Sequence, residues 1–86
     1  MPKHLTPEKL EALKAMPLNG LSNRLKIALA LADVRQIDVV DETGLSAPSI
    51  SNIVNGKYSE LDIEVARQLA NYFGCDIEDL FPKRAA

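Results

Sequence analysis

The side chains that most often carry acid–base, nucleophilic or metal chemistry are few in this sequence. The chain has one histidine, His4, and one cysteine, Cys75, and they stand near opposite ends of its 86 residues. A zinc cluster needs several closely spaced ligands, and a catalytic thiol needs a partner base. The carboxylates are scattered along expected helical faces, and no phosphate-binding loop occurs. We therefore expect no enzyme activity, no metal site and no cofactor.

The size of the chain allows a single domain with one core. Its 86 residues are 47% apolar and 26% charged, which is an ordinary globular composition. The N-terminus lacks the apolar stretch of a signal peptide, and the longest apolar run, 27–32, is far below the roughly 20 residues of a membrane span. We expect a cytoplasmic protein with no membrane partner, in which Cys75 is a small buried thiol.

The net charge of −2 is unevenly distributed. Residues 1–35 contain six lysines and arginines against three acidic residues, whereas residues 60–86 contain three against six. Such a dipolar chain can approach a polyanion with its basic end. Two simply solvated faces fit the same pattern.

The spacing of apolar residues predicts helices almost throughout. They recur at intervals of three and four, and few aromatic or β-branched residues are available for strands. Caps and stops place the helical segments at residues 6–16, 22–33, 35–44, 46–55, 61–72 and 76–81. We expect an all-α fold.

Strong terminators surround the fourth of these segments. Gly44 permits the left-handed backbone that commonly ends a helix, and Ser46 follows as an N-cap with Pro48 in the first turn. Asn55-Gly56 closes the segment. This pair is also a hairpin signal, but no alternating strands flank it, so it indicates a helix end.

Residues 36–57, which run from Gln36 through Gly44 to Asn-Gly-Lys57, resemble the helix-turn-helix of Cro/cI-type (XRE-family) DNA-binding regulators. Asn23-Arg-Leu-Lys is similar to the first helix of that family, and residues 61–81 are similar to its fourth and fifth helices. The resemblance implies a lambda-repressor-like five-helix helix-turn-helix domain at 21–82. An extra N-terminal helical extension at 1–20 would precede it, and a C-terminal tail at 83–86 would follow.

A helix-turn-helix of this kind has a physical reason to bind DNA. Its inward side chains would hold the two helices at a fixed angle; these are Val39, Leu45, Ile50 and Ile53. The second helix then stands out from the surface. It can enter the major groove with the positive end of its dipole near phosphate.

The resemblance implies a sequence-specific DNA-binding transcriptional regulator, expected to be a repressor, that places the helix 47–54 in the major groove. Gln36 would hydrogen-bond a phosphate. The side chains facing the bases would be Ala47, Pro48, Ser51 and Asn52. Asn52 is the best reader, because its amide can pair with N6 and N7 of adenine. Further phosphate contacts are expected from Ser46, Ser49, Asn55, Lys57 and Tyr58.

Several of these polar residues also have a plainer interpretation. Gln36 can be a helix cap and nothing more. Ser46 and Ser49 can cap their own helix, and Tyr58 can pack under the loop. These alternatives stay open at the level of the sequence.

The expected recognition helix is poor in cations. Residues 47–54 contain no lysine or arginine, so one subunit should bind DNA with modest affinity and a shallow salt dependence. Two subunits on a palindromic operator, with half-sites about 34 Å apart, would correct this. We therefore expect a homodimer on double-stranded DNA.

The extra helix at 6–16 is expected to cover an apolar surface. That surface consists of Ile27, Leu31 and Leu29, on a face that is normally solvated. The side chains that can cover it, within the subunit or from a partner, are Leu10, Leu13 and Met16. Apolar residues left exposed, together with the acidic fifth helix, support the alternative of an antitoxin-like protein-interaction module.

Overall fold

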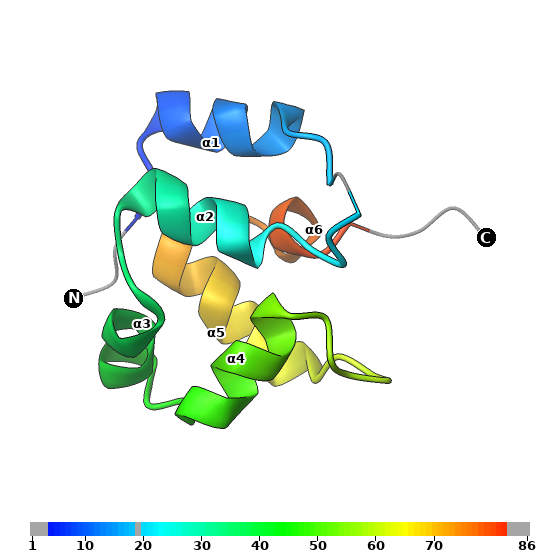
Figure 1. Ribbon diagram of the computed structural model, residues 1–86. Coiled ribbons are helices and arrows are strands. Elements are labelled where there is room, and N and C mark those ends of the chain that lie inside the picture. The colour runs from blue at the N-terminus through cyan, green and yellow to red at the C-terminus, as the bar shows by residue number, and fades with distance from the viewer. Residues whose placement is uncertain (1–3, 19, 83–86) are drawn as a thin grey trace.

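The computed structural model describes residues 4–18 and 20–82. These residues form six helices and no strand, which confirms the all-α prediction (Figure 1). The helices are α1 Pro7–Ala15, α2 Leu25–Ala32, α3 Gln36–Thr43, α4 Ala47–Val54, α5 Ile63–Phe73 and α6 Ile77–Leu80. The expected tail at 83–86 lies outside the described residues.

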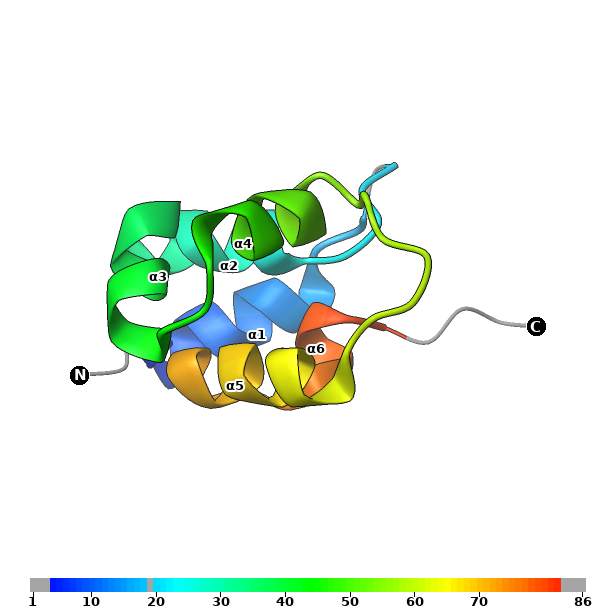
Figure 2. The same ribbon diagram turned by 90° about the horizontal axis from the view of Figure 1, so that it is seen from below.

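The N-terminal helix α1 lies against α2 within the same chain (Figures 1 and 2). Thr6 caps it by accepting a hydrogen bond from the Lys9 amide at 3.3 Å, and Pro7 occupies the first turn. Leu13 and Leu29 are buried as expected, but Ile27 and Leu31, which α1 was also expected to cover, are only half-buried and line an open groove. Met16 was expected to be part of that cover. It is 42% exposed because it comes after the last turn of α1.

Hydrogen bonds connect the start of α2 with the segment after α1 and with α6. Asn23 is buried, and its side-chain oxygen accepts a hydrogen bond from the amide of Leu25, the first residue of α2, at 2.9 Å. The Arg24 amide donates to the carbonyl of Leu80 at 2.7 Å. The Arg24 guanidinium donates to the carbonyl of Met16 at 3.1 Å. One residue thereby joins α2 to α6 and to the segment after α1.

The turn between α3 and α4 has the predicted construction. Gly44 has φ of 77°, and its amide donates to the Val40 carbonyl at 3.0 Å, which ends α3. The Thr43 hydroxyl donates to the Val39 carbonyl and accepts from the Leu45 amide, which closes the corner. The residues predicted to hold the two helices together are buried or half-buried: Val39, Leu45, Ile50 and Ile53.

Helix α5 begins two residues later than predicted. Asp62 caps it by accepting from the Glu64 amide at 2.9 Å, whereas the apolar Leu61 was expected to lie inside the helix. The C-terminal half of α5 forms the centre of the core. There Phe73 is fully buried, and its ring meets the ring of Tyr72 edge-on at 4.9 Å.

Candidate nucleic-acid interface

Helix α4 is buried on one side and open on the other. Ile50 and Ile53 point into the core, whereas the N-cap and the N-terminal turn are exposed. Figure 2 shows α4 lying at the edge of the molecule beside α3. The exposed predicted site residues on and around α4 are Ser46, Ala47, Pro48, Ser49, Asn52, Asn55 and Lys57. Ser51 and Tyr58 are half-buried.

The N-terminus of α4 is built by its own serines. The Ser46 hydroxyl oxygen accepts a hydrogen bond from the Ser49 amide at 3.2 Å, and the Ser46 hydroxyl donates to the Ser49 hydroxyl at 2.7 Å. The capping interpretation of Ser46 is therefore correct. Capping leaves both hydroxyls on the surface, at the end of the helix where the dipole is positive.

Asn52 is the one exposed amide of α4 whose side chain hydrogen-bonds to none of the described residues. Its backbone carbonyl accepts from the Lys57 amide at 2.7 Å, and its side-chain oxygen and nitrogen stay available on the surface. The Asn55 amide, by contrast, lies 3.5 Å from the Ser51 hydroxyl, at the limit of a hydrogen bond. Asn52 is therefore ready to exchange two hydrogen bonds with a ligand.

A shallow groove brings four of the predicted residues together. It has a volume of about 260 Å³ and is lined in part by Ser49, Asn52, Lys57 and Tyr58. Gln36 belongs to α3 instead and does not line this groove. Gln36 is the first residue of α3 and is exposed. The N-cap residue is Arg35, and its amide donates a hydrogen bond to the Asp38 carboxylate at 2.9 Å. The helix-cap interpretation of Gln36 is therefore wrong.

The electrostatics of this groove are mixed. Lys57 is the one cation between residues 36 and 66 of the sequence. Glu60 and Asp62 line the same groove, so two carboxylates lie at its α5 side. Carboxylates repel phosphates, which strengthens the expectation of a modest affinity and a shallow salt dependence.

The loop after α4 is fixed by contacts with the start of α2. Gly56 has φ of 71°, and a Cβ at this position would lie 2.3 Å from the Ser22 hydroxyl, so no other residue fits without movement. The Asn23 side-chain amide donates to the Ile53 carbonyl at 2.8 Å and to the Tyr58 hydroxyl at 3.2 Å. The last turn of α4 and the loop are thereby held against α2.

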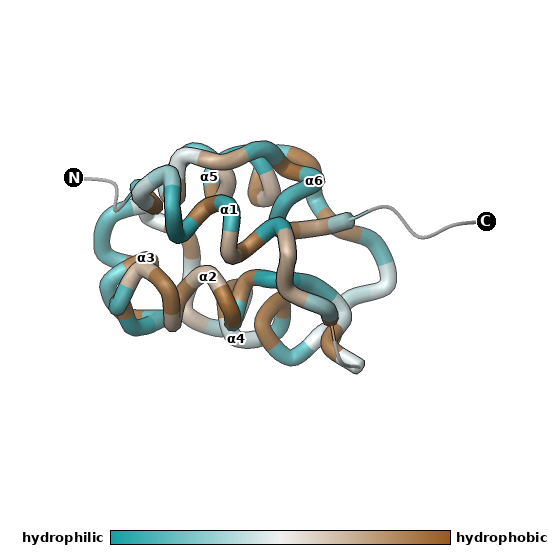
Figure 3. Tube along the Cα trace, turned by 90° about the horizontal axis from the view of Figure 1, so that it is seen from above, coloured by the Kyte–Doolittle hydropathy of each residue, from teal (hydrophilic) through white to brown (hydrophobic). Residues whose placement is uncertain are grey.

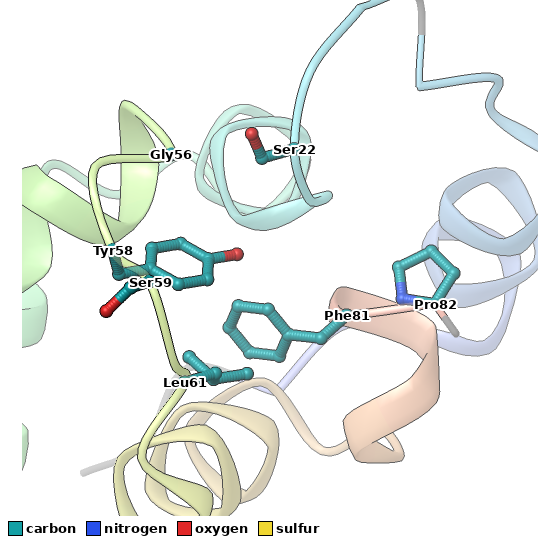
Figure 4. Close-up of a pocket in the computed structure, with 7 residues that line it drawn as sticks. All are labelled: Ser22, Gly56, Tyr58, Ser59, Leu61, Phe81 and Pro82. Carbon is teal, nitrogen blue, oxygen red and sulfur yellow. The ribbon is translucent and has the colours of Figure 1, made fainter. Parts of the chain in front are cut away.

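Tyr58 lies beneath this loop. It lines a pocket of about 360 Å³ with Leu61 and Phe81, and it points from the loop into the space between Ser22 and Phe81 (Figure 4). Its hydroxyl accepts from Asn23 and keeps its own proton to donate. The packing interpretation therefore describes Tyr58, whose phosphate contact remains a proposal.

Asn23 is the positioning residue that the sequence did not reveal. Replacing Asn23 by alanine should lower the free energy of unfolding by about 1–3 kcal/mol, because the buried Ile53 carbonyl would lose its side-chain partner. Urea unfolding followed by circular dichroism measures this change. The exposed amide of Asn71 provides the matched control, and Asn71→Ala should change stability little. Equal effects of the two substitutions would contradict the assigned role of Asn23.

The two residues with conventional catalytic chemistry lie outside this interface. His4 is exposed near the N-terminus. Cys75 is half-buried rather than buried as predicted, because it follows α5 at the surface. Burial, followed by the nearby Asp79 and Asp76 carboxylates, raises the pKa of the Cys75 thiol to about 12. The thiol is therefore protonated near neutral pH and is a poor nucleophile.

Two helices joined by a tight glycine turn, with the second one exposed along its polar side, define a helix-turn-helix protein. The sequence model of the Cro/C1-type HTH DNA-binding domain matches residues 24–82. The chain therefore belongs to the Cro/C1-type HTH family of DNA-binding regulators. Helix α1 lies before the matched region.

A relative and the remaining comparisons agree with this class. The chain is 36% identical over 61 residues to a protein of Methanocaldococcus jannaschii described as an uncharacterized HTH-type transcriptional regulator. The similarity covers 71% of this chain and 91% of the relative. No solved structure matches the chain significantly. Among residues 4–18 and 20–82, no helix has the length and apolar character that crossing a membrane requires.

Proposed function

We propose that this protein is a sequence-specific transcriptional repressor that inserts α4 into the major groove of its operator. The observation that carries the proposal is the exposed, unpaired amide of Asn52, held on a helix whose other side is locked into the core. An asparagine at such a position can pair with adenine through two hydrogen bonds. The proposed base-reading side chains are Ala47, Pro48, Ser51 and Asn52.

Contacts to the DNA backbone would fix the position of α4. The N-termini of α3 and α4 each carry the positive end of a helix dipole, which favours phosphate. Ser46 and Ser49 add hydroxyls at the α4 end, and Lys57 adds the charge. The proposed phosphate contacts are Gln36, Ser46, Ser49, Asn55, Lys57 and Tyr58.

A single copy would bind weakly because Lys57 is accompanied by the carboxylates of Glu60 and Asp62. We therefore propose that two copies bind a palindromic operator with half-sites about 34 Å apart. Selection of bound sequences from a random DNA pool tests both parts. Enrichment of an inverted repeat is the expected result, and a pool that stays random would overturn the proposal.

Lys57→Ala should weaken binding to every DNA sequence by about the same factor, roughly 2- to 5-fold near 0.1 M salt. The loss of one phosphate contact should also reduce the slope of log K against log salt by about 1. Fluorescence anisotropy at several salt concentrations measures both quantities. Lys9→Ala removes an equal charge from α1 and should leave the slope unchanged. A loss confined to one DNA sequence would assign Lys57 to base reading instead.

A protein-interaction module remains the second candidate function. The beginning of α5 exposes Glu60, Asp62 and Glu64 around Ile63, which is 55% exposed. An isolated apolar side chain ringed by carboxylates is suited to a basic protein surface. If no DNA sequence is enriched from the pool, this acidic surface becomes the leading binding site.

A further inference from the structure

The outer face of α2 retains an apolar groove that α1 does not cover. The groove has a volume of about 430 Å³ and is lined by Met16, Leu21, Lys26, Ile27, Ala30 and Leu31. All but one of these side chains are apolar, and Lys26 is the one charged residue of α2. In Figure 3 the tube of α2 has hydrophobic colours over much of its length. An open apolar groove of this kind marks an interaction surface.

Asp33, at the end of α2, departs from two local preferences. It is the one non-glycine residue with a positive φ, 56°, among the described residues, and glycine is the residue that this conformation favours. Its carboxylate also lies at the negative end of the helix dipole, where a cation would be favourable. Side chains that carry such local costs often serve a purpose outside their own helix.

Lys26 and Asp33 form a self-complementary pair of charges. Lys26 lies in the first turn of α2 and Asp33 is its C-cap, so their Cα atoms are two helical turns apart along the same side of the helix, with Ala30 between them. Both are exposed, and neither forms an ion pair within the described part of the chain. If two α2 helices pack antiparallel about a two-fold axis near Ala30, each Lys26 meets the partner's Asp33. The same packing sets Ile27 of each copy near the partner's Leu31.

We propose that this face of α2 is the surface through which two copies of the chain associate. The small side chain of Ala30 allows the helices to approach closely, and Ile27 and Leu31 supply the apolar contact. The two symmetric Lys26–Asp33 pairs fix the antiparallel register. A symmetric pattern of this kind fits a second copy better than an unrelated partner. The inference deepens the dimer of the proposed function and identifies its contact.

Sedimentation velocity of the full chain, without DNA and over a range of concentrations, tests the interface. The unaltered protein should show a reversible monomer–dimer equilibrium. Lys26→Glu and Asp33→Lys should each weaken association at least about tenfold, because each places like charges together twice. The combined variant, Lys26→Glu with Asp33→Lys, should restore most of the association. Lys9→Glu reverses a charge on α1 and should have no effect.

Asp33→Gly separates association from folding. Glycine suits the left-handed backbone, so this variant should melt at a higher temperature when measured at low concentration, yet associate more weakly than the unaltered protein. A purely structural role for Asp33 would not move these two quantities in opposite directions. The interface is wrong if the unaltered chain is monomeric at every concentration or if the single reversals dimerise normally.

Binding to a single DNA half-site distinguishes this inference from the proposed function. The α2 variants leave Ser49, Asn52 and Lys57 intact, so their half-site affinity should equal that of the unaltered protein. A chain that dimerises through α2 but binds no DNA refutes the repressor and keeps the interface. A chain that binds half-sites but never dimerises refutes the α2 interface and keeps the DNA-binding proposal.

Discussion

Replacing Leu13 by alanine should lower the free energy of unfolding by about 2–5 kcal/mol. Leu13 is fully buried between α1 and the rest of the core, so its loss leaves a cavity that the short helix cannot close without separating from α2. Urea unfolding at low protein concentration measures the change. Met16→Ala provides the control, because it removes an apolar side chain that is 42% exposed in the same segment. That substitution should cost less than about 1 kcal/mol.

The result for Leu13 decides whether α1 is part of the folding unit. A cost near that of Met16→Ala would mean that α1 is only loosely attached and that residues 24–82 are stable by themselves. A large cost would mean that the helix before the family domain is needed to complete its core. We expect the second outcome because Leu5, just before α1, is also buried, and its amide donates to the Phe73 carbonyl at 2.7 Å.

Replacing Asn52 by alanine should remove base preference at one position of the operator. The amide is proposed to pair with adenine, and a bidentate pair of this type is worth about 1–3 kcal/mol, or roughly 5- to 150-fold in discrimination. The measurement compares affinities for the selected operator and for operators with each base pair changed in turn. In the Asn52→Ala variant, one of those changes should no longer matter.

The control for Asn52 is a matched amide away from α4. Asn71→Ala alters an exposed asparagine of α5 and should leave every base preference intact. A uniform loss of affinity across all operators in the Asn52→Ala variant would contradict base reading. It would assign Asn52 to the DNA backbone, in the manner proposed for Lys57.

The helix-turn-helix was predictable because its signals are local. Gly44 ends α3 and Ser46 caps α4 through contacts within three or four residues, and such contacts can be read directly from sequence. The predicted start of α5 was two residues too early because Leu61 fits the apolar spacing of the helix. In the structure Asp62 is the N-cap, and its side chain accepts a hydrogen bond from the Glu64 amide, so the helix begins after it. Leu5 did not appear as a core residue because it lies outside any periodic pattern.

The exposed residues of the candidate site were predictable from the sequence, but the contacts that hold α4 and the following loop in place were not. The exposure of Asn52 follows from the helical spacing of Ile50 and Ile53, which fixes the opposite side of α4 in the core. The bonds from Asn23 to Ile53 and Tyr58 span 30 and 35 residues. Nothing in the sequence near Asn23 specifies such partners, because Asn23 reaches them only when α2 packs on the end of α4 in the folded chain.

The mixed charge of the groove beside α4 has a consequence for the protein in the cell. Attachment to arbitrary chromosomal DNA depends almost entirely on cations, and here Lys57 is opposed by Glu60 and Asp62. The genome would therefore sequester few of the molecules, and most would stay free to search. The repressor that we propose would then keep its operator occupied with a small number of copies.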